Sequence, residues 1–195
     1  MVHVYFAPVL EGVMEKVFPL RRQAQLEETK NHRSRRQRYT AWKLLQYGLR
    51  HSQGLDPEQL EFFLDDRGRW SCDRCFFSLS HSGDAVAVAI SDAPVGIDME
   101  SLQRMAHPAL PGKILTGSEQ TEFAALEEPQ KNQYLLEKWC CKESLFKWKE
   151  AAKTNQPAEI CTGRVTLGQQ EYCYAVATTK KEQLRLRILE NDLWN

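Results

Sequence analysis

Apolar positions divide the first part of the chain into an extended stretch and a helical one. Residues 2–6 (VHVYF) alternate well enough to predict a strand. Residues 35–51 carry apolar side chains at three- and four-residue steps, which predicts an amphipathic helix. This stripe consists of Tyr39, Trp42, Leu45 and Leu49. Gly54 and Pro57 mark its end, and the Asp56-Pro57-Glu58 run predicts a short helix carrying Leu60 and Phe63.

The middle of the chain is rich in short apolar runs bounded by turn residues. Residues 76–80, 85–90 and 95–99 each predict a strand. Gly83-Asp84 predicts the first turn between them, and Pro94 shortens the second connection. The order is therefore one helix followed by three strands.

The second half repeats this order. A short helix is predicted from Ser118 to about Glu127, and a long one from Pro129 to about Ala152. Three strand-like runs follow, at 164–167, 172–177 and 184–189. Two successive units of this kind predict an α+β fold with two similar lobes, residues 1–101 and 102–195. In each lobe, a long helix would pack on a small, mainly antiparallel, three-stranded sheet.

The composition indicates that the chain can bury a hydrophobic core, and the charged residues are unevenly distributed along it. The 195 residues are 42% hydrophobic, and 26 basic residues balance 26 acidic ones, which argues against a protein built for bulk nucleic-acid binding. Residues 21–50 nevertheless hold nine basic residues against two acids, a net charge of +7. Residues 92–128 hold seven acids against two bases, a net charge of −5. The contrast suggests anionic ligands in one region and a cation in the other, although a solvated helix face and an acidic loop would give the same pattern.

The cysteines and the first residues predict a cytoplasmic protein with reduced thiols and no membrane segment. The N-terminus has no secretory pattern, and no stretch approaches the roughly 20 apolar residues of a membrane helix. Cys72 and Cys75 form a lone C-x-x-C; structural zinc normally needs a second such pair and none is visible, so metal binding and redox chemistry are both disfavoured at this pair. Cys140 and Cys141 are interpreted as packing residues.

Two carboxylates end the third of the middle strands. Asp98 and Glu100 are two residues apart, so they point to the same side of a strand. Two acids so placed repel each other unless a cation or a proton lies between them. The alternative is a pair of exposed acids at a strand end.

Two further charged residues lie on the predicted long helix. Trp139, Glu143 and Lys147 follow each other at four-residue steps and therefore share a face. Glu143 and Lys147 could form a simple surface ion pair. Taken with Asp98 and Glu100, however, they supply three oxygen ligands and one ammonium group. That set fits a Mg²⁺ site facing a pyrophosphate, with Lys147 adding positive charge where the phosphoryl group reacts.

An anion site is the interpretation favoured for the Ser80-His81-Ser82 run. Hydroxyl and imidazole groups can all donate to phosphate oxygens, and arginines lie upstream. Arg69, just before this strand, could contribute another cation. A lone histidine with a structural or surface role is the alternative.

Taken together, these residues resemble the signature of the 4′-phosphopantetheinyl transferases. The likeness rests on Ser80-His81-Ser82, on Gly96-Ile97-Asp98-Met99-Glu100, and on Trp139-x-x-Lys142-Glu143-Ser144-x-x-Lys147. In the small, trimeric branch of that family the G-x-D-x-E-type segment lies near the N-terminus, whereas about 95 residues precede it here. The chain therefore resembles the larger, surfactin-synthetase-activating branch, in which two lobes related by a pseudo-twofold axis form a monomer and coenzyme A lies between them.

The resemblance implies a reaction and a role for each matching residue. It implies transfer of the 4′-phosphopantetheine arm of coenzyme A to a serine of an apo acyl or peptidyl carrier protein, with release of 3′,5′-ADP. Asp98, Glu100 and Glu143 would bind Mg²⁺, and Glu143 would also act as the base. Lys147 would neutralise or protonate the departing group, while Ser80 and His81 would contact the 3′-phosphate end of coenzyme A. The first-lobe cations nearest to the family pattern are Arg21, Arg22 and Arg69.

Two rival functions stay open at this point. A metal-dependent phosphodiesterase or nuclease could use the same carboxylates and would hydrolyse its substrate without a protein acceptor. A non-catalytic module could bind coenzyme A or a carrier protein without transfer. A nucleic-acid reader is disfavoured by the zero net charge and by the absence of an aromatic stacking pattern.

Overall fold

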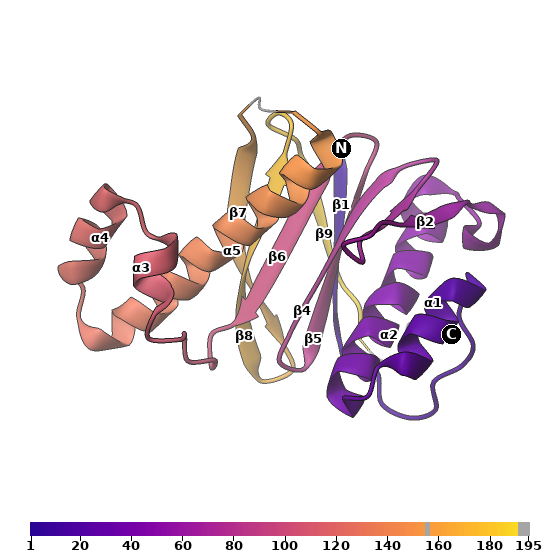
Figure 1. The fold of residues 1–195 in the computed structure, drawn as a ribbon, viewed down its shortest axis with the longest axis horizontal. Coiled ribbons are helices and arrows are strands. Elements are labelled where there is room, and N and C mark those ends of the chain that lie inside the picture. Colours follow the sequence, from indigo (N-terminus) through magenta and orange to yellow (C-terminus); the bar gives the residue numbers. More distant parts are fainter. Residues whose placement is uncertain (155–156, 191–195) are drawn as a thin grey trace.

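The computed structural model describes residues 1–154 and 157–190 of the chain. Two sheets pack face to face at its centre, and a long helix covers the outer face of each (Figure 1). The strands of the first sheet are, in spatial order, β4 (Phe76–Ser82), β5 (Ala85–Ser91), β1 (Val2–Pro8) and β9 (Leu184–Ile188). Those of the second sheet are β6 (Val95–Ser101), β8 (Gln170–Thr178) and β7 (Glu159–Leu167). The predicted α+β class, with helices on small and mainly antiparallel sheets, is confirmed.

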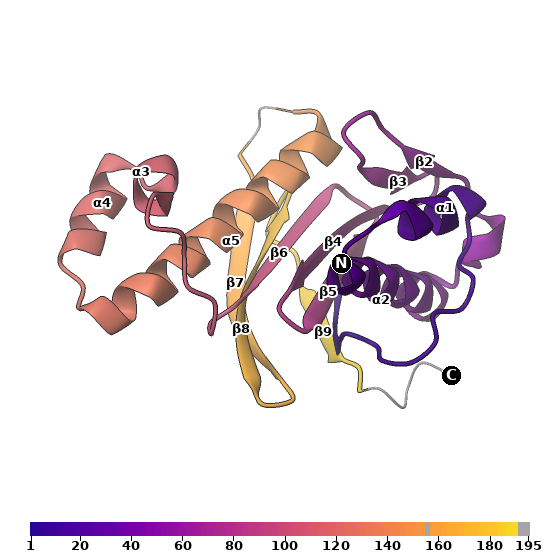
Figure 2. The same ribbon diagram turned by 60° about the horizontal axis from the view of Figure 1, so that its bottom comes forward.

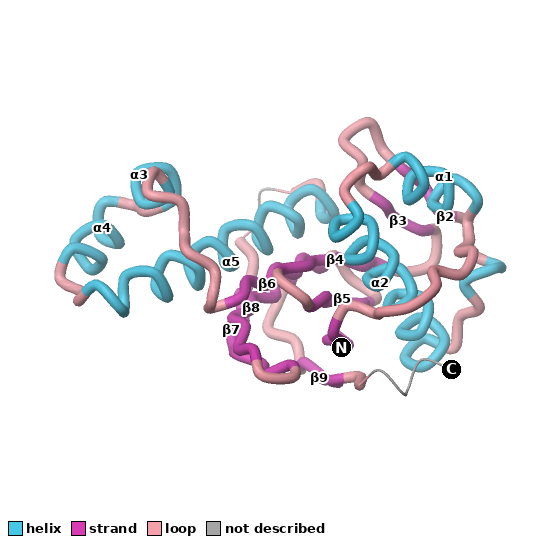
Figure 3. Tube along the Cα trace, turned by 90° about the horizontal axis from the view of Figure 1, so that it is seen from below, coloured by secondary structure: helices cyan, strands magenta, loops and turns pink. Residues whose placement is uncertain are grey.

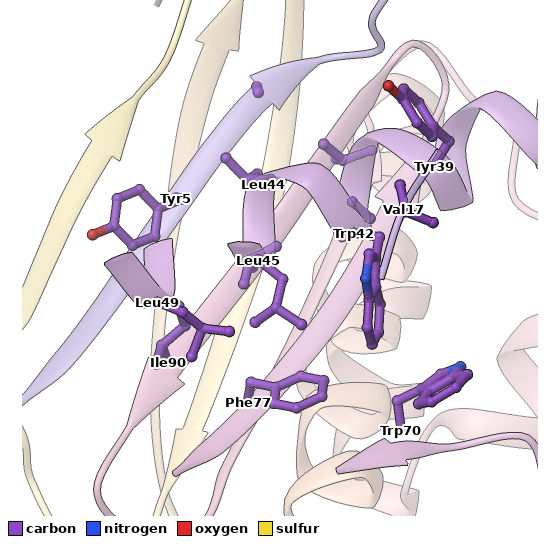
Figure 4. Close-up of a cluster of buried hydrophobic side chains, with 14 of the residues drawn as sticks. Tyr5, Val17, Tyr39, Trp42, Leu44, Leu45, Leu49, Trp70, Phe77 and Ile90 are labelled. Carbon is purple, nitrogen blue, oxygen red and sulfur yellow. The ribbon is translucent and has the colours of Figure 1, made fainter. Parts of the chain in front are cut away.

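Helix α2 (His32–Gly48) covers the first sheet. It begins where the Asn31 side chain accepts the Ser34 N–H, and it continues as a π-helical turn, η1 (Leu49–Gln53). The predicted apolar stripe faces the sheet and is fully or nearly fully buried. Figure 4 shows this core, in which Trp42 lies beside Trp70 and Phe77.

A second core fills the space between the two sheets. Alternate residues of each strand point into it, as the period of two predicts. Its fully buried members are listed by strand as Val2, Val4, Phe6, Ala85, Ala87, Ala89, Val95, Ile97, Met99, Tyr172 and Val176. The opposite side of β6 is therefore left to face the second long helix.

Helix α5 (Glu128–Ala152) runs across the outer face of the second sheet (Figures 1 and 2). Two short helices, α3 (Leu110–Ile114) and α4 (Gly117–Ala124), lie beside its N-terminal half and project away from the sheets. Glu119 joins α4 to α5 through ion pairs with Lys138 and Lys142. Although α5 has 25 residues, neither it nor any other helix of the described chain has the length and apolar character needed to cross a membrane.

The membership of the two sheets differs from the prediction: β6, expected with β4 and β5, pairs with β8 in the second sheet, and β1 and β9 complete the first sheet. Strand β9, expected beside the other C-terminal strands, runs parallel to β1 with Val2 opposite Leu184. It pairs there because β5 leaves the other edge of β1 open, and because Leu184 packs against the core between the sheets. The alternation of residues predicts a strand but cannot identify its partner. The pseudo-twofold relation between the halves stays a prediction.

Three further elements surround the first core. They are the helix α1 (Leu20–Glu28), the short turn η2 (Pro57–Gln59), and the hairpin of β2 (Phe62–Leu64) and β3 (Trp70–Cys72). The prediction that the helix after Asp56 carries Phe63 is wrong, because that residue lies in β2. The hairpin forms because Asp65 accepts the N–H groups of Arg67 and Arg69, and Gly68 adopts a φ of 79°.

Candidate active site

Helix α5 lies against β6 because residue 96 has no side chain. A Cβ placed on Gly96 would collide with the carbonyl oxygen of Ser144 and the backbone nitrogen of Trp148. Both of these helix residues are fully buried. The glycine of the G-x-D-x-E segment therefore lets the polar side chains of α5 reach the carboxylates on the same face of β6.

Asp98 is buried and joined to α5 by an ion pair. Its Oδ1 accepts from the Lys147 Nζ at 2.7 Å and from the Ser80 hydroxyl at 2.8 Å. Lys147 also donates to the carbonyls of Ile97 at 2.9 Å and Leu79 at 3.3 Å, so it connects β6 with β4. The Oδ2 atom of Asp98 is buried and has no hydrogen-bond partner within the described chain. Asp98 thus keeps one oxygen unengaged.

The other two carboxylates share this environment. Glu100 is buried; its Oε1 accepts from Arg104 at 2.6 Å, and its Oε2 accepts from Ser82. Glu143 on α5 is half-buried. Burial raises the pKa of the Glu143 carboxyl above its ordinary value, the charge of Asp98 raises it further, and Lys147 opposes both. Asp98 and Glu143 therefore lie on the same side of the molecule, within reach of each other's charge.

The three carboxylates do not form a finished metal site. In residues 1–154 and 157–190, no group of three His, Cys, Asp or Glu side chains is arranged to hold a metal ion. The donors nevertheless fit Mg²⁺, which prefers oxygen ligands and commonly takes one or two carboxylates, with phosphates and waters completing the octahedron. The buried Oδ2 of Asp98, which has no hydrogen-bond partner among the described residues, is the atom that would bind such an ion. A cation there would also relieve the repulsion that raises the pKa of Glu143.

A cavity of about 510 Å³ adjoins the carboxylates, with Lys147 in its wall. Its walls come from α1, α2, the β2–β3 turn, β4 and α5. We call it the basic cavity, because its charged lining is mostly cationic. The lining residues are Arg22, Gln25, Arg38, Ala41, Arg67, Gly68, Arg69, Trp70, Phe77, Ser78, Leu79, His81, Phe146, Lys147 and Glu150.

Arg22 is the most buried cation of this cavity. It is 5% exposed, lies over the Trp42 ring at 4.9 Å, and donates to Gln25 and to the Arg38 carbonyl. No acid of the described residues pairs with it, and its Nε–H has no acceptor there. Burial, and then the charge of Arg38, lower the pKa of Arg22 to about 10. The guanidinium is therefore buried without the anion that such a group ordinarily requires.

Arg69 and His81 extend the same pattern. Arg69 donates through Nη2 to the Lys147 carbonyl, and its Nη1 is buried without a partner among the described atoms. Part of the His81 ring is exposed, but the cavity walls exclude water from the rest. This loss of hydration lowers the pKa of His81, and the charges of Lys147 and Arg38 lower it further. A bound anion would oppose these effects, because its negative charge favours the protonated imidazole.

The structure sorts the remaining residues named from the sequence. Arg21 is exposed and does not line the basic cavity, although its neighbour Arg22 does. Ser80 is buried, and its hydroxyl bonds Asp98 and the Met99 N–H. It therefore points toward the carboxylates, whereas His81 lines the basic cavity.

Two cations of the lining escaped sequence reasoning. Arg38 and Arg67 both line the basic cavity, and Arg67 pairs with Glu150 across it. Arg38 lies in the strongly basic stretch before the helix, so charge counting marked its region but not the residue. Arg67 precedes a turn glycine, and nothing in its local pattern distinguishes it.

A family comparison covers slightly less than half of the chain, in the segment that contains the carboxylates. Residues 94–185 match the family model of the 4′-phosphopantetheinyl transferase superfamily. This segment includes both the Gly96–Glu100 motif and the Glu143–Lys147 face of α5. The resemblance to this superfamily is therefore confirmed.

Curated relatives carry the same family name. The chain is 28% identical over 107 residues to "4'-phosphopantetheinyl transferase psf-1" of Bacillus pumilus, a match that covers 53% of this chain and 46% of that protein. It is also 28% identical over 103 residues to a 4'-phosphopantetheinyl transferase of Bacillus subtilis, with 48% and 43% covered. The matched region thus spans a little under half the length of these phosphopantetheinyl transferases.

Proposed function

We propose that this chain is a Mg²⁺-dependent 4′-phosphopantetheinyl transferase of the larger, two-lobed type. It would transfer the phosphopantetheine arm of coenzyme A to a serine of an apo acyl or peptidyl carrier protein. One observation carries the proposal: Arg22 and Arg69 have no acidic partner among the described residues, and they share a cavity with Lys147, whose ammonium group pairs with the buried Asp98. Coenzyme A has the matching pattern of charge, a 3′-phosphate at one end and a pyrophosphate in the middle.

Binding would satisfy the groups that are left without partners. The 3′-phosphate suits the basic cavity, where the Arg22 Nε–H and an Arg69 N–H lack acceptors among the described residues. Charge-assisted bonds from guanidinium groups to phosphate are short and strong. The pyrophosphate would then lie toward Lys147 and the carboxylates, where bound Mg²⁺ would supply charge neutralisation.

The reaction is a direct displacement at phosphorus. The carrier serine oxygen forms a bond to the β-phosphorus as the bond to 3′,5′-ADP breaks. Glu143 accepts the serine proton, a role that suits a carboxyl whose pKa is raised. Lys147, held by two backbone carbonyls, neutralises the charge that develops on the departing group. The protein thus mainly positions the reactants and compensates charge.

The carrier would approach along the basic side of α2. Carrier proteins of this kind are acidic, and Arg33 and Arg38 are both exposed on this helix; Arg38 also lines the basic cavity, whereas Arg33 pairs with Asp84. Electrostatic steering of this kind accelerates association and weakens with salt. We further propose a cytoplasmic monomer; the absence of any disulfide among the six cysteines agrees with a reducing compartment.

The test is incubation of the chain with coenzyme A, Mg²⁺ and a panel of apo carrier proteins. We expect one carrier to gain the mass of a phosphopantetheine group, and we expect its serine→alanine variant to gain nothing. Hydrolysis of coenzyme A at the same rate without a carrier would instead support the phosphodiesterase alternative. Coenzyme A binding by calorimetry, with no transfer to any carrier, would support a non-catalytic module.

A further inference from the structure

Three alternate serines of β4 bind the free edge of β6, which lies beside β4 in Figure 3. The hydroxyl oxygens of Ser78, Ser80 and Ser82 accept the backbone N–H groups of Ile97, Met99 and Ser101 at 3.0, 3.2 and 3.0 Å. All three serines are at most 6% exposed. Since β6 is an edge strand, these N–H groups would otherwise be buried without acceptors. The serines therefore join the two sheets along their edges.

Two of the three serines also bind a carboxylate. Ser80 donates to Asp98, and Ser82 donates to Glu100. Ser78 accepts a β6 N–H in the same way, yet no carboxylate of the described chain receives its proton. The chain thus contains a matched pair, in which Ser78 has the sheet-joining bond alone and Ser80 has that bond plus a carboxylate.

The bond from Ser80 fixes which oxygen of Asp98 is left unengaged. Ser80 and Lys147 both bind Oδ1, so the carboxylate is held from one side and Oδ2 has no partner among the described groups. Partners of this kind around a metal ligand fix its orientation, and their loss typically costs roughly 10–100-fold in metal affinity.

We propose that Ser80 is a positioning residue, which orients Asp98 so that Oδ2 faces a divalent cation. The proposal rests on the proposed function, and it assigns Ser80 to the metal side of the site, away from the 3′-phosphate of coenzyme A. Ser82 would support Glu100 in the same manner.

The experiment compares Ser80→Ala with Ser78→Ala without turnover. Mn²⁺ binding is measured by electron paramagnetic resonance without a carrier protein, both without and with coenzyme A; the series without coenzyme A is the one that compares the two variants, because Ser78 also lines the basic cavity. We expect Ser80→Ala to weaken Mn²⁺ binding by about tenfold or more and Ser78→Ala to change it little, although each loses one buried bond to β6. Ser80→Thr, which keeps a hydroxyl, supplies a second variant if the alanine form does not fold, and it should stay close to wild type.

A second readout separates the metal role from a phosphate role. The ratio of affinities for coenzyme A and for dephospho-coenzyme A should be unchanged in Ser80→Ala and reduced in His81→Ala. Unchanged Mn²⁺ affinity in Ser80→Ala, or loss of the affinity ratio, would overturn the proposal. If the wild type transfers nothing but Ser80→Ala still weakens Mn²⁺ binding, the proposed function fails and this inference stands. If transfer occurs and Ser80→Ala leaves Mn²⁺ binding unaffected, the proposed function stands and this inference fails.

A different observation concerns the C-x-x-C that no step of the transfer uses. Cys72 ends β3 and Cys75 precedes β4, and their sulfur atoms lie 3.5 Å apart. Cys72 is half-buried, whereas Cys75 is buried. The hydrogen bond between the two sulfur atoms lowers the pKa of Cys72 and raises that of Cys75, and the Cys72 Sγ also lies 3.3 Å from the Cys75 carbonyl oxygen. An accessible sulfur with thiolate character thus lies against a buried second thiol.

We infer that Cys72 and Cys75 form a redox-active dithiol that low-molecular-weight disulfides oxidise to an intrachain disulfide. The Cys72 thiolate would attack the reagent, forming a mixed disulfide and releasing one thiol. The Cys75 sulfur, losing its proton, would then attack the Cys72 sulfur and release the second thiol. Two electrons pass from the protein to the reagent, which is reduced to two thiols.

The chain contains its own control for this inference. Cys140 and Cys173 approach to 3.7 Å, but both are almost fully buried between α5 and β8. Oxidised glutathione should therefore give a Cys72–Cys75 disulfide, detected by peptide mass mapping, well before a Cys140–Cys173 one. Cys75→Ser should stop at a glutathione adduct on Cys72. A wild-type chain that keeps Cys72 reduced, or that retains the adduct on it, would contradict the inference.

Discussion

The Lys147 side chain lies between the basic cavity and the carboxylates of β6, and the two regions differ in whether their charged side chains have ion-pair partners. In the cavity, Arg22 and Arg69 have no acid within ion-pair distance in the part of the chain that the structure describes. On β6, Asp98 is paired with Lys147, and Glu100 is paired with Arg104. One region therefore holds uncompensated charge, and the other holds charge already compensated.

This difference indicates how the two regions would bind their ligands. Buried cations without an anionic partner lower the stability of the ligand-free chain, and a bound anion would restore it. The basic cavity is therefore complementary to an anion at the expense of stability in the free protein. The carboxylates can take a divalent ion only at the oxygens that their present partners leave, above all Oδ2 of Asp98. We therefore expect that removing an unpaired charge, in either region, will not lower the unfolding free energy of the ligand-free chain.

Glu143→Gln should have the largest effect on transfer. It removes a charge that the carboxylate side of the site needs, and we expect the rate to fall by at least about 100-fold in a carrier mass assay. Stability should change the other way. The pKa of Glu143 is higher in the folded chain than in the unfolded one, so its ionisation disfavours the folded chain at neutral pH. Without metal at pH 7, the variant should therefore unfold at a higher denaturant concentration than wild type; a lower midpoint would contradict this.

Gly96→Ala should separate the two regions physically. The new methyl group would collide with α5 and push Lys147 away from Asp98. Overpacking of this kind typically costs about 1–3 kcal/mol of unfolding free energy, and a small displacement of reacting groups can cost up to about 100-fold in rate. Gly117→Ala is the control, because its Cβ would meet nothing within 4 Å. Equal stabilities for the two variants would show that the close approach is unnecessary.

Arg22→Met tests whether the uncompensated charge is kept for an anion. Calorimetry should show at least about tenfold weaker coenzyme A binding, because a desolvated charge contact is lost. The lowered pKa of Arg22 means that its charged form is disfavoured in the folded chain, so the unfolding free energy should not fall. Arg21→Met, at the exposed neighbouring position, should affect binding little. A stronger effect at Arg21 would restore the prediction made from sequence for that residue.

His81 provides the smallest and most specific effect. Its lowered pKa keeps the imidazole neutral near pH 7 in the free protein, with Lys147, Arg38 and Asp98 as the charges around it. A bound phosphate would raise this pKa, so binding should take up part of a proton and strengthen as the pH falls toward 6. Titrations in buffers of different ionisation enthalpy should show uptake that is larger in wild type than in His81→Gln. Equal uptake would place the phosphate elsewhere.

The sequence predicted the elements that carry the carboxylates because their patterns are local. The period of two placed Asp98 and Glu100 on one side of a strand, and four-residue steps placed Glu143 and Lys147 on one face of a helix. What brings these faces together is Gly96, whose role depends on the packing of a helix almost 50 residues away. The resemblance to a known family, more than periodicity, predicted that the two segments meet.

Other features depend on partners that no local pattern records. Strand β9 was recognisable as a strand, but its pairing with β1 depends on which edge the fold leaves open. Arg21 and Arg22 are identical in type, and only the docking of α1 on Trp42 decides which one is buried. The direction of the Ser80 hydroxyl likewise follows from the edge-to-edge contact of two sheets.

Thermodynamic linkage tests most directly whether the basic cavity and the carboxylates form one site. Coenzyme A is titrated calorimetrically into the chain with and without Mg²⁺, and Mg²⁺ is titrated with and without coenzyme A. If one ligand spans both regions, each should tighten the binding of the other by the same factor, and Asp98→Asn should remove the coupling. Independent binding of the two, with no change in either affinity, would contradict the account.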